Sequence, residues 1–132
     1  MNPETPHVIH AAVTVALAAL FVFMGVNHFV PKSARTMAAM IPPSMRFTGI
    51  LSPRTLVFLT GLCEVAGGVG LLVPALRLAA AFALAVFLVA VFPANAYAAG
   101  KRERFGAVAV PLVPRTVGQL VLIALLLFVA RG

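Results

Sequence analysis

Four long apolar segments, almost free of charged residues, set what this chain can fold into. They lie at about residues 8–30, 54–73, 78–98 and 114–131. Because a helix rises 1.5 Å per residue, about 20 apolar residues cross the roughly 30 Å hydrocarbon core of a bilayer. Lipid offers the backbone no hydrogen-bond partners, so a spanning segment satisfies its own N–H and C=O groups as a helix. We therefore predict an all-α, polytopic membrane four-helix bundle, with residues 1–132 forming one membrane domain.

The composition excludes the main alternatives. Of the 132 residues, 62% are hydrophobic and 10% are charged, whereas a soluble domain carries about 25% charged residues. A soluble enzyme of this size would have too little polar surface to cover its core, and disordered chains are poor in apolar residues. The net charge of +7 comes from basic residues at the ends of the apolar segments. This placement is typical of membrane topology, so we expect the lipid bilayer as a partner and no nucleic acid.

The basic residues are divided unequally between the two ends of the predicted bundle. Two, Arg77 and Arg131, belong to the end that carries both termini. The other eight flank linkers 31–53 and 99–113: Lys32, Arg35, Arg46, Arg54, Lys101, Arg102, Arg104 and Arg115. The positive-inside rule then places both linkers in the cytoplasm and both termini outside, in a bacterial-type cytoplasmic membrane.

The first linker contains a short amphipathic segment. Its apolar residues recur at helical spacing on the face opposite Lys32 and Arg35. They are Ala34, Met37, Ala38 and Ile41. The pattern predicts a short helix that lies in the membrane interface between the first two spans. Pro42 and Pro43 end it.

Polar side chains in the spans gather in the membrane half next to the linkers. Antiparallel helices bring six of them to a similar depth: Asn27, His28, Glu64, Asn95, Tyr97 and Gln119. Because polar groups are costly in hydrocarbon, we predict one shared polar cluster inside the bundle. Three interpretations stay open: hydrogen bonding that holds the helices together, a site for a ligand, proton or quinone, and contact with a partner protein.

Glu64 is the most constrained of these residues. It lies about 15 Å into its span, close to the midplane, where an ionised carboxylate costs roughly 2.5–3.5 kcal/mol. It must therefore be neutral, paired or hydrogen-bonded. His28 is the basic partner at a suitable depth, and Arg115 can reach inward.

Small residues and one proline shape the predicted bundle. Gly61, Gly67, Gly68 and Gly70 predict close packing of the second span against its neighbours. Pro93 removes one helix hydrogen bond, which predicts a kink that widens the bundle near the polar cluster, although prolines are also tolerated in membrane helices.

The sequence offers little for metal, haem or thiol chemistry. Cys63 has no partner cysteine, and we expect a small buried residue there instead of a nucleophile. One histidine and one glutamate do not make a structural metal site. Haem is not expected either, because His7 and His10 belong to the surface opposite His28.

Several motifs, in order along nearly the whole chain, resemble the DoxX-like family of small four-helix integral membrane proteins. They include Ile41-Pro42-Pro43, the run GLCEVAGGVGLLVP (61–74), Arg77, and the run FPANAY (92–97). The end of the first span (Phe21, Gly25, His28, Phe29 and Pro31) and the start of the fourth (Arg115, Gln119, Leu122 and Ile123) complete the set.

The resemblance implies a four-helix membrane bundle associated with redox work. Some members of that family are subunits of a thiosulfate:quinone oxidoreductase, others accompany thiol-handling or antioxidant proteins, and an animal relative assists assembly of nicotinic receptors. The family's recurrent polar positions correspond here to Asn27, His28, Glu64, Asn95 and Gln119. A single cysteine in this chain argues against a dithiol mechanism.

Three hypotheses follow. The first is a redox-associated accessory subunit whose polar cluster holds a quinone-like or other small amphipathic ligand, with quinone as its one candidate cofactor. The second is a non-catalytic assembly or stabilising factor for a membrane or redox partner protein. The third is a small proton-coupled transporter. A homo-oligomer is compatible with each, and the sequence carries no self-contained catalytic motif that would assign catalytic residues.

Overall fold

The computed structural model describes residues 4–45, 52–99, 101 and 111–131. Four helices in these ranges are long and apolar enough to cross a membrane: α1 (Thr5–Asn27), α3 (Pro53–Leu72), α4 (Arg77–Ala98) and α6 (Leu112–Ala130). A shorter helix, α2 (Pro31–Ala39), and a 3-10 turn (Pro43–Met45) follow α1. The described ranges contain no strand. The prediction of an all-α four-helix membrane bundle is confirmed, and each span lies within about three residues of its expected bounds.

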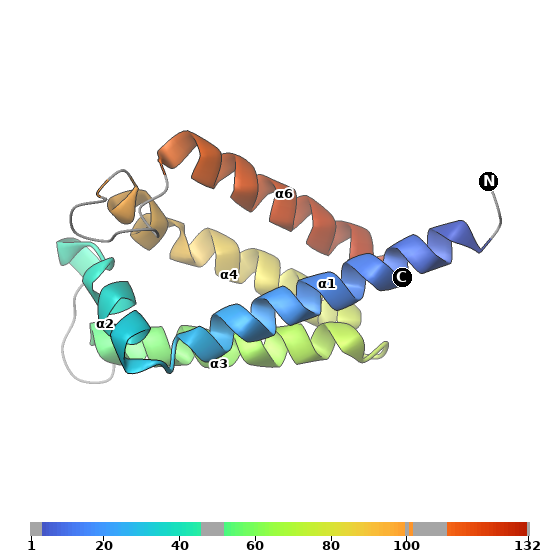
Figure 1. Cartoon of the computed structure of the whole chain (residues 1–132), viewed down its shortest axis with the longest axis horizontal. Helices are drawn as coiled ribbons and strands as arrows, with labels where there is room; N and C mark the ends of the chain where they lie inside the picture. Colours follow the sequence, from blue (N-terminus) through green and yellow to red (C-terminus); the bar gives the residue numbers. More distant parts are fainter. Residues whose placement is uncertain (1–3, 46–51, 100, 102–110, 132) are drawn as a thin grey trace.

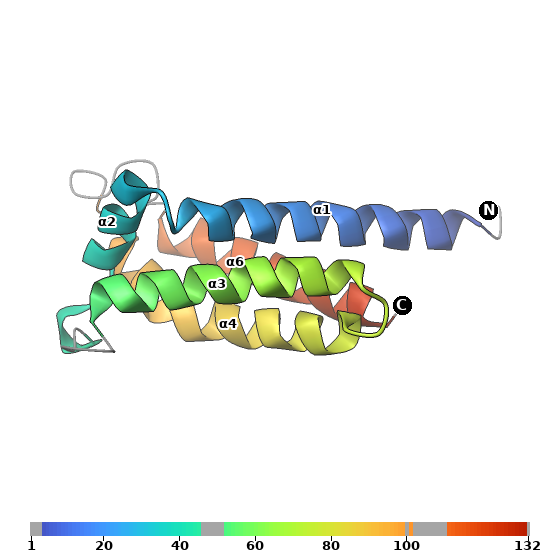
Figure 2. The same ribbon diagram turned by 90° about the horizontal axis from the view of Figure 1, so that it is seen from below.

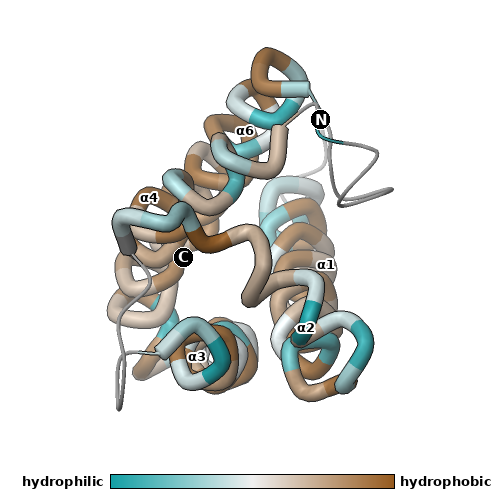
Figure 3. The backbone as a smooth tube through the Cα atoms, turned by 90° about the vertical axis from the view of Figure 1, so that its left-hand side faces the viewer, coloured by the Kyte–Doolittle hydropathy of each residue, from teal (hydrophilic) through white to brown (hydrophobic). Residues whose placement is uncertain are grey.

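The helices run side by side, with both chain ends at one end of the bundle and α2 at the other (Figure 1). We call these the terminal end and the linker end. The first turns of α1 extend beyond the other helices at the terminal end (Figures 1 and 2). Seen from the linker end, α2 lies beside the ends of α1 and α3 (Figure 3).

Local sequence signals account for where α3 begins and how it connects to α4. The Ser52 side chain accepts a hydrogen bond from the backbone N–H of Thr55 at 3.4 Å, and Pro53 occupies the first turn. This arrangement satisfies a backbone donor that a helix start otherwise leaves unpaired. At the other end of α3, Arg77 Nε donates to the Leu71 carbonyl oxygen at 2.8 Å, which ties the short connection to the start of α4.

Helices α1 and α3 approach through glycines. A Cβ atom on Gly25 would lie 2.8 Å from the Gly61 carbonyl oxygen, and one on Gly61 would lie 2.5 Å from His28 Cβ. Two turns further along α3, a Cβ on Gly68 would lie 3.0 Å from the Ala18 carbonyl oxygen of α1. These distances are too short for any side chain, so glycine is what lets the two backbones touch.

The other two predicted packing glycines face α4. A Cβ on Gly67 would meet the Leu84 side chain at 2.6 Å, and one on Gly70 would lie 2.9 Å from Ala80 Cβ. Helix α3 is therefore the central element, in close contact with α1 on one side and α4 on the other. The main apolar core lies beside these contacts and includes Leu17, Phe21, Leu71, Leu84, Leu126 and Val129.

Helix α6 completes the bundle against α4 and touches α1 near the terminal end. There, His10 Nε2 donates to the Val129 carbonyl oxygen at 3.0 Å, and the His10 and Phe128 ring centres lie 5.6 Å apart. Towards the linker end, α6 and α1 diverge (Figure 1). Helices α1 and α6 thus meet near the terminal end and lie further apart at the linker end.

The amphipathic helix is present, but its apolar face packs against the protein itself. Ala34 and Ile41 are buried together with Val57 of α3, and Met40 is buried against Ala98 of α4. The predicted short amphipathic helix between the first two spans is confirmed, and it lies at the linker end of the bundle. The start of α3 supplies enough apolar surface to cover its apolar face.

Two further residues of the spans lie on the outer surface. Cys63 is exposed, so the expectation that it is buried is wrong. It precedes Glu64 by one position, and a helical turn of 100° per residue directs it away from the interior when Glu64 points inward. Pro93 is also exposed, and α4 continues through it to Ala98.

The close contact of α1 and α3 makes a prediction about stability. Gly61→Ala would force the two helices apart, and overpacking of this kind costs about 1–3 kcal/mol. We expect a lower thermal unfolding midpoint in detergent. Gly118→Ala is the matched control, because no heavy atom beyond the neighbouring backbone of α6 lies within 4 Å of the added Cβ. Equal midpoints for the two variants would contradict the packing role of Gly61.

Candidate ligand-binding cavity

A cavity of about 550 Å³ lies at the linker end of the bundle, and α1, α2, α3, α4 and α6 all contribute to its lining. Its volume is within the range of about 300–1,000 Å³ that is typical of small-molecule sites. Apolar side chains such as Met24, Leu88 and Val91 form most of its wall. The polar side chains that line it are His28, Thr60, Glu64, Asn95, Arg115 and Gln119.

The first polar group of the cavity is a pair formed by His28 and Glu64. Glu64 is 5% exposed, and its Oε2 lies 2.9 Å from His28 Nε2. The ring N–H direction is not aligned with this oxygen, so Oε2 receives no well-aligned hydrogen bond from a described residue. The contact expected between the two side chains is nevertheless present, and it is close.

The hydrogen bond of the other His28 ring nitrogen determines how many protons the His28–Glu64 pair holds. Nδ1 donates to the Val57 carbonyl oxygen at 2.9 Å and lies 3.1 Å from Thr60 Oγ1. With Nδ1 committed as a donor, a neutral imidazole presents an unprotonated Nε2 to the carboxyl group. Two bare acceptors 2.9 Å apart repel, so the pair holds one proton, either on the imidazole or on the carboxyl. Both forms have zero net charge, which removes much of the cost of an acid at this depth.

The second polar group comes from α4 and α6. Arg115 Nη1 donates to Asn95 Oδ1 at 3.2 Å. One helical turn further along α6, Gln119 Oε1 is buried and has no hydrogen-bond donor among the described residues. A buried amide oxygen without a donor is destabilising by about 1–3 kcal/mol. Gln119 thus offers an acceptor to whatever enters the cavity.

The structure brings together four of the six polar residues that the sequence singled out. His28, Glu64, Asn95 and Gln119 line the cavity, whereas Asn27 and Tyr97 do not. Asn27 Oδ1 accepts a hydrogen bond from Ser33 Oγ of α2 at 3.0 Å. Tyr97 packs beside Met40 and Ala98, with the Lys101 ammonium 4.3 Å from its ring centre. The single cluster of six is therefore incorrect.

Helix geometry explains why Asn27 and Tyr97 face elsewhere. Asn27 precedes His28 by one residue and is rotated by about 100° from it, while Tyr97 follows Asn95 by two residues and is rotated by about 200°. A common depth in the membrane does not imply a common face. Both residues instead join contacts that hold the linker end together.

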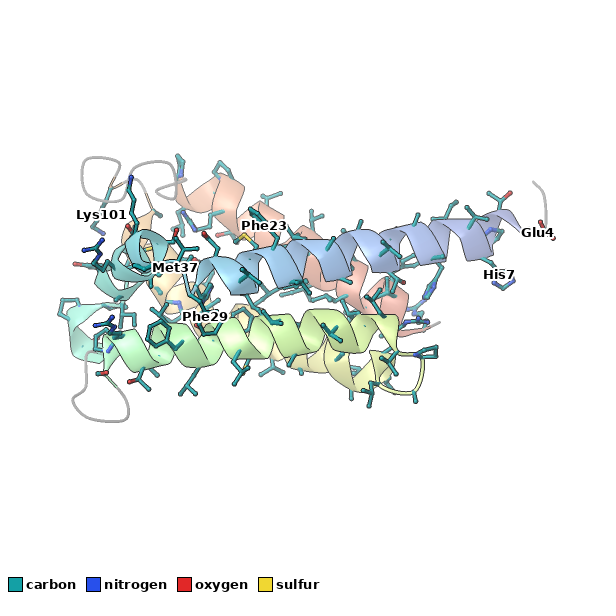
Figure 4. All side chains as sticks on the ribbon, turned by 60° about the horizontal axis from the view of Figure 1, so that its bottom comes forward. Glu4, His7, Phe23, Phe29, Met37 and Lys101 are labelled. Carbon is teal, nitrogen blue, oxygen red and sulfur yellow. The ribbon has the colours of Figure 1, made fainter. Side chains whose placement is uncertain are left out.

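Sequence reasoning missed part of the cavity lining. Thr60 lies four residues before Glu64 on the same face of α3, so helical spacing was a signal for it. Met24 stands in the same relation to His28 on α1. Met37 of α2 and Met40, the residue that follows this helix, enter the lining only because α2 packs on the bundle (Figure 4 labels Met37).

The arrangement suits binding better than self-contained catalysis. Flexible methionine side chains adapt to the shape of a ligand, and the two polar groups supply a proton-bearing pair and an unsatisfied acceptor. In the described ranges, no three His, Cys, Asp or Glu side chains gather as metal ligands do. The available chemistry is hydrogen bonding and proton exchange with a partly apolar molecule.

Fold and cavity together define a class: helical membrane proteins with four spans and an apolar-walled cavity that contains a buried His–Glu pair. Residues 17–130 match the family described as Domain of unknown function (DUF8561), and the chain belongs to that family. No curated protein and no solved structure matches the chain.

The His28–Glu64 contact makes a prediction about energetic coupling. His28→Ala and Glu64→Ala, alone and combined, should show a coupling free energy of unfolding of about 1–3 kcal/mol, because each partner left alone is a buried polar group without compensation. Denaturant unfolding in mixed micelles measures it. The matched control replaces His10, at the terminal end, and this substitution should be additive with Glu64→Ala within about 0.5 kcal/mol. Additivity of the His28 and Glu64 substitutions would contradict the pairing.

Proposed function

We propose that this protein holds an amphipathic ligand of the quinone class in the cavity at its linker end, as an accessory subunit of a membrane redox system. The observation that carries the proposal is one apolar-walled cavity that contains both the His28–Glu64 pair and a buried amide oxygen, Gln119 Oε1, without a donor among the described residues. A ring that carries hydroxyl groups supplies the donor that Gln119 Oε1 lacks and can also donate to the Glu64 carboxyl group. Its apolar tail fits the remaining wall and the surrounding lipid.

The proton on the His28–Glu64 pair adds to this proposal. Conversion between a quinone and its hydroquinone moves protons as well as electrons, so a neighbouring pair that gives and takes one proton suits such a ligand. Arg115 and Asn95 supply donors on the opposite wall for carbonyl or ether oxygens. The motif resemblance to DoxX-like proteins, some of which belong to a quinone-linked oxidoreductase, supports the same class of ligand.

The proposal also includes an orientation. Eight of the ten Lys and Arg residues belong in the sequence to the two linkers or their flanks, three of them (Arg46, Arg102 and Arg104) outside the described residues, and two, Arg77 and Arg131, lie at the terminal end. We propose that linkers 31–53 and 99–113 face the cytoplasm of a bacterial-type cytoplasmic membrane and that both termini face outward. The cavity then lies in the cytoplasmic half of the bilayer, where protons exchange with the cytoplasm.

Ligand binding predicts a shift of the unfolding midpoint. Titration with short-chain ubiquinone and menaquinone analogues should stabilise the wild-type protein by about 2.7 kcal/mol at a ligand concentration of 100 times Kd. The reduced forms should stabilise it more than the oxidised forms, because hydroxyl groups donate to Glu64 and Gln119. Thermal shift in detergent, under reducing and oxidising conditions, is the measurement.

Two cavity variants test whether the stabilisation comes from ligand bound in the cavity. Glu64→Gln and Gln119→Leu should each weaken the response, whereas Cys63→Ser, at the exposed position beside Glu64, should leave it unchanged. Absence of stabilisation in the wild type, or an equal response in Glu64→Gln, would overturn the quinone proposal. Recovery of a stoichiometric membrane partner would then favour the assembly-factor hypothesis.

The orientation predicts which sites are reachable from each side. A single cysteine introduced at Arg35, in a Cys63→Ser background, should react with a membrane-impermeant maleimide only after the cells are opened. A cysteine at His7 should react in intact cells. The opposite pattern would reverse the proposed topology.

A further inference from the structure

A second hollow lies at the terminal end of the bundle, on the side opposite the cavity. It is about 680 Å³ in volume and is lined by seven residues from the starts of α1 and α4 and the end of α6. Four of the seven are basic or imidazole side chains, and none is acidic: His7, His10, Arg77 and Arg131. The remaining three, Pro6, Ile9 and Phe128, are apolar. We call this hollow the basic corner.

The basic corner is positive at any physiological pH, because Arg77 and Arg131 stay protonated. A hydrogen bond to the backbone positions the Arg77 side chain. Its Nε donates to the Leu71 carbonyl oxygen at 2.8 Å, which leaves the terminal guanidinium nitrogens for another acceptor. His10 is held by its hydrogen bond to the Val129 carbonyl oxygen and by the Phe128 ring. No described residue forms a salt bridge with either arginine.

The position of the basic corner indicates the source of its ligand. The first turns of α1, which carry His7, project past the ends of α4 and α6 (Figures 2 and 4), and their residues form one wall of the basic corner. The apolar spans continue directly from this level, with exposed Ile9 and Phe128 at its edge. Headgroups of a bilayer that surrounds these spans lie at this depth, and their acyl chains follow the apolar wall.

We propose that the basic corner binds the phosphate of an anionic phospholipid headgroup. Arginine guanidinium groups pair with phosphate through charge-assisted hydrogen bonds, and a site with two arginines and two imidazoles favours a headgroup of net negative charge over a zwitterionic one. The bound lipid connects α1 with α6 at the end where those helices meet. This site is separate from the cavity at the linker end, and the lipid proposal does not depend on the quinone proposal.

The test uses the full chain in a neutral detergent, titrated with phosphatidylglycerol, with phosphatidylcholine and with inorganic phosphate. Native mass spectrometry counts bound lipid, and thermal shift reports stabilisation. We expect phosphatidylglycerol to bind at least tenfold more tightly than phosphatidylcholine. The double variant His7→Gln/Arg131→Gln should bind phosphatidylglycerol about tenfold more weakly than the wild type, the effect of losing one charge-assisted hydrogen bond.

Arg35→Gln is the matched control, because Arg35 is an exposed arginine of α2 at the linker end. It should keep the full preference for phosphatidylglycerol. Without lipid, His7→Gln/Arg131→Gln should unfold at the wild-type midpoint, which separates ligand loss from misfolding. Equal binding of the two lipids, or an equal loss in Arg35→Gln, overturns the site. If inorganic phosphate alone gives the full stabilisation, the ligand is a soluble phosphate and the assignment to lipid is wrong.

Discussion

The close approach of α1 and α3 is the constraint on which the rest of this structure depends. Gly25 and Gly61 allow the two backbones to touch, and this contact holds His28 at 2.9 Å from Glu64. A carboxyl group near the bilayer midplane is tolerable only with such a partner, because lipid cannot solvate it. The contact through Gly25 and Gly61 is therefore what allows the His28–Glu64 pair to form inside the bundle.

Packing differs between the two ends of the bundle, and this difference creates the cavity. At the terminal end, large apolar side chains such as Leu84 and Leu126 are fully buried, and His10 joins α1 to α6. At the linker end, α6 diverges from α1 (Figure 1), and Met37 of α2 and the following Met40 line the cavity. The result is a densely packed apolar core beside the terminal end and a cavity at the linker end that can accept a ligand.

The two hollows present different chemistry to the membrane. The cavity contains a pair with zero net charge and a buried amide acceptor, which suits a weakly polar, hydrogen-bonding ring. The basic corner contains two permanently charged arginines, which suit a phosphate. Because Arg77 also ties the start of α4 to Leu71, charge at the terminal end is positioned by the backbone instead of by an acidic partner.

The sequence by itself determined the number of spans, their bounds, the need of Glu64 for a partner and the packing role of Gly61, Gly67, Gly68 and Gly70. These follow from hydrophobic length and residue size, which act locally. Only the tertiary structure decided the rotation of each helix, and so it separated Asn27 and Tyr97 from the cavity, turned Cys63 outward and laid α2 on α3. Depth in a membrane is set by position along the chain, whereas the face that a residue presents is set by how neighbouring helices interlock.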